Sequence, residues 1–222
     1  MLSPNFGERR DGLRPELVVV HFTGMASCAA ALERLCDPEA EVSAHYLIDY
    51  DGGIRELVPE EARAWHAGAG HWRGLTDINS RSIGIELANT GAEPFAERQM
   101  AALENLLSGI LQRWAIPAEG VIAHSDMAPG RKADPGGRFD WRRLALGGLS
   151  VWPARAPENE PPEAFAAWAR AFGYPDAPES TLLAAFRLRF RPWARGACTA
   201  GDAAAARNLA LRFGVDRSVS EA

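Results

Sequence analysis

Short apolar runs separated by turn residues dominate the first two thirds of the chain. The β-branched run LVVVHF at residues 17–22 predicts a strand that is buried on both faces of a sheet. Residues 82–88 and 121–124 predict two further strands of this kind. Residues 45–50 and 54–58 flank an Asp-Gly-Gly turn signal, in which glycine allows the positive φ of a tight turn, and therefore predict a hairpin.

Helical patterns lie between and after these runs. Residues 26–35 are rich in helix-forming side chains and stop before Pro38, while apolar residues recur at helical spacing from 103 to 114. Three shorter amphipathic stretches follow near the end of the chain, at residues 163–172, 180–190 and 202–213. The pattern predicts an α/β (α+β) fold: a mixed, mostly β sheet flanked by helices on both faces, and a small all-α C-terminal module.

A proline-rich segment separates these two parts. Four prolines lie in VWPARAPENEPPE, which is too rich in proline for regular structure. The length of 222 residues suits one full domain with a small appendage. We therefore expect a first domain over residues 1–148, a linker over 149–162 and a three-helix module over 163–222.

Composition narrows the class of protein. With 47% hydrophobic residues and a net charge of -5, the chain can bury a core, and it has no basic block that would favour nucleic acid as a partner. No apolar stretch has the ~20 residues that a membrane helix needs. Three cysteines without a C-x-x-C pair indicate a reducing compartment. The first residues lack a signal-peptide run, so we expect a cytoplasmic location, or a periplasmic one if the true start lies upstream.

Two histidines lie at the ends of predicted strands. His21 and His124 would meet at the carboxyl edge of the sheet, where ligands collect in α/β folds, and Asp134 stands ten residues after the second. Two imidazoles and a carboxylate can hold Zn²⁺ and leave one position open for water, as catalytic zinc sites do. The alternative is that these histidines are ordinary core or surface residues.

Two further charged residues stand out. Glu86 lies inside an apolar strand, where it is either a general base with a raised pKa or the solvent-facing residue of an alternating strand. Lys132 is the only lysine of the chain, which otherwise uses arginine, so the position either requires an ammonium for oxyanion stabilisation or holds one by chance.

A glycine-rich loop carries two tryptophans, Trp65 and Trp72, each beside a histidine. Tryptophans in exposed loops pack against something or bind something. They therefore indicate either stacking on a sugar or peptide, or a loop folded onto its own aromatic side chains.

Five segments in order resemble the motifs of one family: LVVVHFTGM, SAHYLIDYDG, AWHAG, INSRSIGIEL and AHSDMAPGRKADPG. The chain resembles, over about residues 2–146, the type 2 N-acetylmuramoyl-L-alanine amidases, AmpD/AmiD-like zinc enzymes that cleave the amide between the lactyl group of N-acetylmuramic acid and L-alanine in peptidoglycan. The resemblance implies one Zn²⁺ per chain held by His21, His124 and Asp134, with Glu86 and Lys132 as catalytic residues.

The same resemblance implies a peptidoglycan or muropeptide substrate and a groove near Tyr46, Trp65, His66, Asn79 and Arg81. The resemblance gives no metal role to His45 or His71. The sequence does not define the oligomeric state, for which we favour a monomer. The alternatives are a peptidoglycan-recognition protein without catalysis, which a missing metal ligand would signal, and a cytosolic scaffold, against which bound zinc would argue.

Residues 163–213 more faintly resemble the three-helix peptidoglycan-binding module of some of these enzymes. Phe186-Arg187 stands where that module commonly has Phe-Gln, and the third helix lacks the usual Gly-x-x-Thr start. We expect the fold to be kept and binding to be altered or lost. A wall-binding tail would favour intact sacculus as substrate, but the missing signal segment favours soluble 1,6-anhydromuropeptides.

Overall fold

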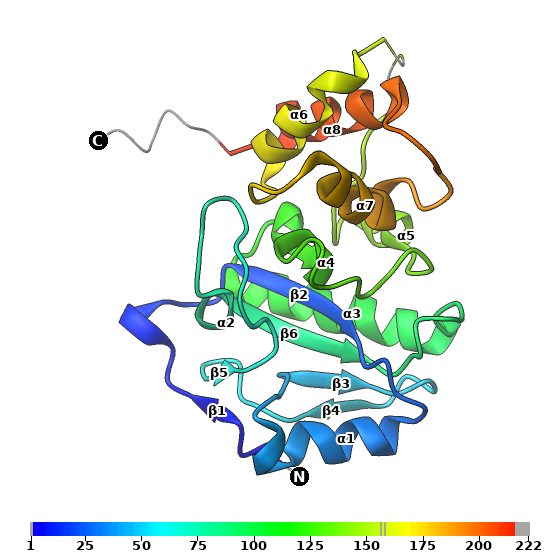
Figure 1. Ribbon diagram of the computed structural model, residues 1–222. Helices are drawn as coiled ribbons and strands as arrows, with labels where there is room; N and C mark the ends of the chain where they lie inside the picture. The colour runs from blue at the N-terminus through cyan, green and yellow to red at the C-terminus, as the bar shows by residue number, and fades with distance from the viewer. Residues whose placement is uncertain (1, 156, 158, 216–222) are drawn as a thin grey trace.

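The computed structural model describes residues 2–155, 157 and 159–215. Its centre is a five-stranded sheet in the order β4-β3-β6-β2-β7 (Figure 1). The strands, in that order, are Ile54–Glu56, Tyr46–Ile48, Ser82–Leu87, Leu17–Phe22 and Val121–Ala123. The strand pairs β3–β6, β6–β2 and β2–β7 are parallel, and β3–β4 is the antiparallel hairpin that the turn signal predicts. The expected mixed sheet is confirmed.

The helices are α1 (Cys28–Cys36), α2 (Ile78–Arg81), α3 (Glu97–Trp114), α4 (His124–Met127), α5 (Trp141–Leu146), α6 (Phe165–Phe172), α7 (Glu179–Phe190) and α8 (Ala200–Phe213). Short 3-10 turns span Arg10–Gly12, Pro38–Ala40, Ala118–Gly120 and Pro162–Ala164, and β1 (Phe6–Gly7) pairs with β5 (Arg63–Ala64) beside the main sheet. Among the described residues, none of these helices has the length and apolarity needed to cross a membrane.

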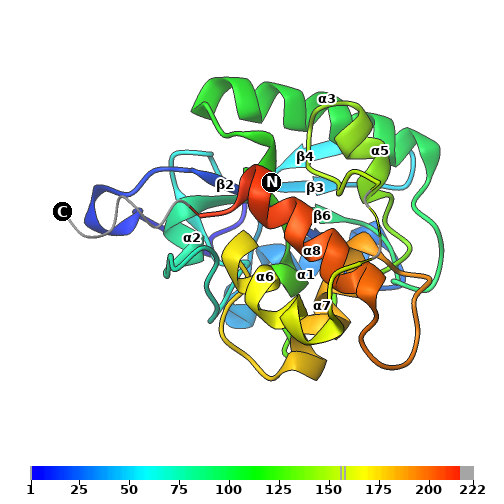
Figure 2. The same ribbon diagram turned by 90° about the horizontal axis from the view of Figure 1, so that it is seen from above.

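The two faces of the sheet are covered by different helices. Figure 2 shows α3 on one side of the strands and α1, α6, α7 and α8 on the other. Side chains alternate along β2, so Val18 and Val20 pack in the cluster under α3, while Leu17 and Val19 pack in the cluster with the C-terminal helices. The side chain of His21 points to the same face as those of Leu17 and Val19, which is the face opposite α3.

Element ends differ slightly from the sequence-based expectations. The first helix begins at Cys28 rather than at residue 26, because the hydroxyl of Ser27 accepts from the backbone N–H of Ala30 at 3.2 Å and caps it. The strand expected over 121–124 ends at Ala123, and His124 begins the short helix α4.

The C-terminal helices share a hydrophobic core with the sheet. Phe172 and Phe186 belong to the same buried cluster as Val19. Trp72, fully buried, packs edge-on against Phe172 and Tyr174, with ring centroids 5.5 and 5.1 Å apart. This tryptophan of the glycine-rich loop therefore packs in the core.

The three expected C-terminal helices are present. The described residues between 151 and 161 form no helix or strand. The boundaries at 148, 162 and 222 stay predictions, and residues 156, 158 and 216–222 lie outside the described part. The last helix, α8, starts with a capping box: the Thr199 hydroxyl accepts from the backbone N–H of Asp202, and the Asp202 carboxylate accepts from the backbone N–H of Thr199.

A buried ion pair joins α7 to the end of the sheet. Arg189 pairs with Asp126 of α4 and donates to the carbonyl of Val121 at 2.9 Å and to the hydroxyl of Ser150 at 3.1 Å. The hydroxyl of Tyr174 donates to the other carboxylate oxygen of Asp126 at 2.6 Å. Because removal of one partner would leave a buried charge uncompensated, this network fixes the turn that follows β7.

Candidate active site

Three candidate metal ligands converge at the carboxyl edge of two neighbouring parallel strands. His21 lies at the end of β2, and His124 directly follows β7, which pairs with β2. The Nδ1 atoms of the two imidazoles are 2.9 Å apart, and Oδ2 of Asp134 lies 2.9 Å from the first and 3.0 Å from the second. The structure therefore brings together all three residues that the sequence indicates as ligands.

His21 and Asp134 have the charge states that metal binding needs. Burial and the neighbouring His124 lower the pKa of His21 to about 4, which keeps its imidazole neutral. Burial alone would raise the pKa of Asp134, but the adjacent imidazoles of His124 and His21 hold that pKa well below its ordinary value. An ionised carboxylate and imidazole nitrogens, all within 4.8 Å, form a donor set that fits Zn²⁺.

Glu86 lies beside the candidate ligands. It is the partner of His21 in the parallel register of β6 and β2, so both side chains point to the same face of the sheet. Its Oε2 is buried without a hydrogen-bond partner among the described residues. Burial and, secondarily, the charge of Asp134 raise its pKa to about 8, while Lys132 opposes the shift. The alternating strand thus points this carboxylate into a cavity, not into open solvent.

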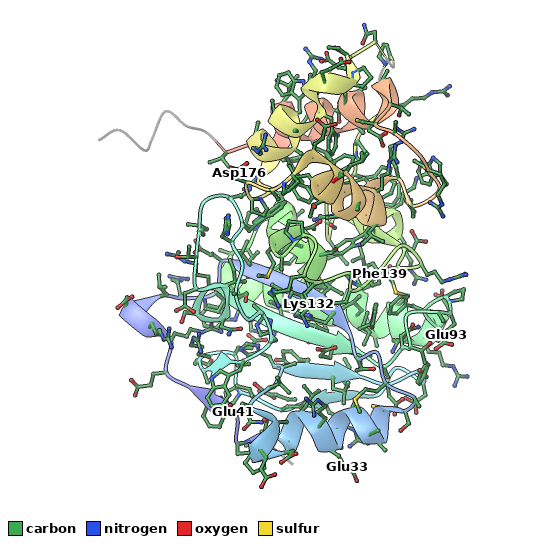
Figure 3. The ribbon with its side chains drawn as sticks, viewed as in Figure 1. Glu33, Glu41, Glu93, Lys132, Phe139 and Asp176 are labelled. Carbon is green, nitrogen blue, oxygen red and sulfur yellow. The ribbon has the colours of Figure 1, made fainter. Side chains whose placement is uncertain are left out.

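The cavity has a volume of about 270 Å³. His21, His124, Asp134 and Glu86 line it on the sheet side, and Ala31, Arg34 and Leu35 of α1 line it on the other. Lys132 (labelled in Figure 3) is exposed at its rim, on the loop between α4 and Asp134. The cavity is therefore a cleft with two cations, one general-base candidate and a group of metal donors.

Three of the five residues expected near a substrate groove lie at or beside this cavity. Trp65 and His66 line it. Asn79 is buried, and its Oδ1 accepts from the backbone N–H groups of His66 at 3.1 Å and Ala67 at 2.8 Å, so it supports the loop that forms the cavity wall.

Tyr46 and Arg81 lie elsewhere. Tyr46 pairs with Ile85 across β3 and β6, so its side chain points to the α3 face, where its hydroxyl donates to Glu60 at 2.8 Å. Arg81, at the end of α2, donates to the carbonyl of Thr76 at 3.0 Å and pairs with a surface glutamate. The structure does not bring these two side chains to the cavity.

Sequence reasoning did not single out Arg131, which also contributes to the site. Its guanidinium donates to the carbonyl of Ala67 at 2.8 Å, and Ala67 accepts from Nε2 of His124 at 2.9 Å as well. The only local signal was its position next to Lys132, because a contact with a backbone carbonyl 64 residues away leaves no pattern in the chain.

Comparison with known proteins assigns a family. Residues 11–137 match the N-acetylmuramoyl-L-alanine amidase family. The N-acetylmuramoyl-L-alanine amidase AmiD of Escherichia coli is 36% identical over 237 residues, which covers 91% of this chain and 85% of that protein. The 1,6-anhydro-N-acetylmuramyl-L-alanine amidase AmpD of Haemophilus influenzae is 39% identical over 159 residues, covering 64% of this chain and 86% of its own.

Solved structures agree with this assignment. Escherichia coli AmiD in complex with the substrate anhydro-N-acetylmuramic acid-L-Ala-D-gamma-Glu-L-Lys superposes with a TM-score of 0.83 at 32% identity, covering 96% of this chain and 99% of that one. AmpDh3 of Pseudomonas aeruginosa with an anhydromuramic pentapeptide gives 0.82 at 30% identity, covering 97% and 96%. The chain belongs to the N-acetylmuramoyl-L-alanine amidase family, as the sequence motifs indicate.

The ligand assignment predicts the metal content of a variant. We expect purified protein to bind one zinc ion per chain and His124→Ala to lose it, because two remaining donors hold zinc far less tightly than three. Elemental analysis after dialysis measures this, with His71→Ala as the matched control because His71 is not one of the three converging donors. Equal zinc in His124→Ala and in the unsubstituted protein would contradict the assignment.

Proposed function

We propose that the protein is a zinc-dependent N-acetylmuramoyl-L-alanine amidase, which hydrolyses the amide between the lactyl group of anhydro-N-acetylmuramic acid and L-alanine. The convergence of His21, His124 and Asp134 beside Glu86, in one cavity, carries this proposal. With all three donors present, a recognition protein without catalysis is disfavoured.

His21, His124 and Asp134 would hold the metal. Zn²⁺, when bound, supplies a Lewis acid that polarises a carbonyl and makes water a nucleophile at neutral pH. The carboxylate of Glu86, which a bound dication would keep ionised against the effect of burial, accepts a proton from the attacking water and returns it to the leaving amine nitrogen. The ammonium of Lys132, at the cavity rim, stabilises the negative charge that develops on the carbonyl oxygen.

We propose soluble anhydromuropeptides as the substrate class. AmiD and AmpDh3 bind anhydromuramyl peptides in their solved complexes. Arg34 places a cation on the cavity wall in addition to the catalytic candidate Lys132, which suits a carboxylate of a short acidic peptide. Incubation with an anhydromuramyl tripeptide, and separately with purified sacculi, tests this by mass spectrometry of the released peptide. Release from sacculi alone would contradict the substrate class, and release from neither would contradict the activity.

Glu86→Gln is expected to keep the fold and bound zinc but to lose about 10²- to 10⁴-fold in kcat, because the nearly isosteric amide cannot accept the proton. Cleavage of the anhydromuramyl tripeptide, with zinc content measured on the same sample, gives the result. Full turnover by this variant would remove the general-base role of Glu86.

Lys132→Ala is expected to lower kcat by about 10²- to 10³-fold with little change in KM, because the oxyanion contact forms only as charge develops. Lys132→Arg keeps the charge but changes its shape, so a positional role predicts a substantial loss for this variant too. Steady-state kinetics on the same substrate measures both.

If Lys132 is only a solvated loop residue, both variants will match the unsubstituted protein, as surface substitutions usually do. Full activity of Lys132→Arg alone would show that charge suffices and that the ammonium is not specifically required. Neither result would affect the assignment of Glu86.

A further inference from the structure

One loop contacts the outer nitrogens of both candidate imidazole ligands. Nε2 of His21 lies 3.1 Å from Nδ1 of His66, and Nε2 of His124 donates to the carbonyl of Ala67 at 2.9 Å. His66 and Ala67 are consecutive residues of the segment AWHAG. The two imidazoles come from the end of β2 and from the start of α4, and consecutive residues of a single loop contact their outer nitrogens.

The hydroxyl of Ser82 fixes the direction of the hydrogen bonds that link it to His66 and His66 to His21. Ser82 Oγ lies 2.5 Å from the carbonyl oxygen of Ile78, which can only accept, so the single hydroxyl proton goes there. Ser82 Oγ must then accept from Nε2 of His66, which is 3.3 Å away. A neutral imidazole that donates through Nε2 accepts through Nδ1.

This direction fixes the tautomer of the first ligand. Because Nδ1 of His66 accepts, Nε2 of His21 carries the proton and donates to it. The lone pair of His21 Nδ1 is then left facing Asp134, 2.9 Å away. The carbonyl of Ala67 has the same effect on His124, so both imidazoles present Nδ1 to the place where the three donors meet.

The loop itself is held in place. A single side-chain oxygen of Asn79 accepts from the N–H groups of both His66 and Ala67, at 3.1 and 2.8 Å. Arg131 donates to the carbonyl of Ala67 from the other side at 2.8 Å. These contacts fix the backbone from which both outer contacts are made.

Gly84 provides the space that the His66 ring occupies. A Cβ added at Gly84 of β6 would lie 2.4 Å from Cγ of His66 and 2.7 Å from its Nδ1, closer than side chains tolerate. The ring therefore lies directly on the strand, with its centroid 5.1 Å from that of His21 at an interplanar angle of 78°. A glycine in the middle of a buried strand has a packing reason here.

We propose that His66 and Ala67 hold the two imidazole ligands of the metal site from outside, and that His66 is a positioning residue that sets the tautomer and orientation of His21. The proposal rests on the metal site of the proposed function. It gives His66 a role other than substrate contact. The Ser82 hydroxyl then orients the His66 ring, and Gly84 leaves the space that this ring occupies.

Two substitutions of His66 separate its hydrogen bond from its bulk. His66→Leu keeps apolar volume but offers no acceptor, and we expect the zinc affinity to fall by roughly 10- to 100-fold, as when outer-shell partners are removed elsewhere. His66→Asn places an amide oxygen near the position of Nδ1, so we expect it to bind zinc more tightly than His66→Leu. His71→Leu is the matched control with unchanged affinity. The readouts are zinc dissociation constants from chelator competition and the visible absorption of the Co²⁺-loaded protein.

Gly84→Ala tests the same contact without removing any polar group. We expect it to displace the His66 ring, weaken zinc binding and shift the Co²⁺ spectrum, because the ligand field changes when His21 reorients. Equal affinities and equal spectra for His66→Leu and the unsubstituted protein would overturn the proposal. So would equal losses for His66→Leu and His66→Asn, since the acceptor would then be irrelevant. If the unsubstituted protein binds no zinc, the metal site of the proposed function fails instead.

Discussion

The contact on which the site depends is the buried carboxylate of Asp134 against the Nδ1 atoms of His21 and His124, at 2.9 and 3.0 Å. An unpaired charge in such a place is costly, so this carboxylate requires positive charge beside it. A dication bound by one carboxylate and two neutral imidazoles leaves a net charge of about +1, which suits the activation of water. The parallel pairing of β2 with β7 makes the contact possible, because it brings the two strand ends to the same edge.

The metal and catalytic candidates could be predicted from the chain because each leaves a local signal. His21 closes an apolar run, Glu86 interrupts another, and Lys132 is the only lysine of the sequence. Their meeting follows from strand alternation and from parallel pairing, which are general rules of β-sheets. The structure brings all of these residues to one cavity.

Other positions depend on contacts that no local pattern contains. Tyr46 lies on the α3 face because of its register with Ile85, which cannot be read from its own segment. His66 touches a ligand that is 45 residues away, and Trp72 is covered by helices that follow a hundred residues later. The resemblance placed His66 near the groove, and only the hydrogen-bond directions around it indicate what its ring does.

The C-terminal helices contribute to the same architecture. They cover the face of the sheet that carries the site and share its hydrophobic core. Arg189 of α7 pairs with Asp126 of α4, the short helix that begins with His124. The match to AmiD covers 91% of this chain and that to AmpD of Haemophilus influenzae 64%. In this chain the helices are therefore packed as part of the catalytic fold, in addition to any binding role.

Anomalous diffraction at the zinc absorption edge, on crystals of the zinc-loaded protein, tests the central claim most directly. We expect one strong peak about 2.0–2.2 Å from Nδ1 of His21, Nδ1 of His124 and a carboxylate oxygen of Asp134, with no fourth protein ligand. A peak bound through Nε2 of either histidine, a fourth protein ligand that closes the site, or a zinc ion held elsewhere would contradict it.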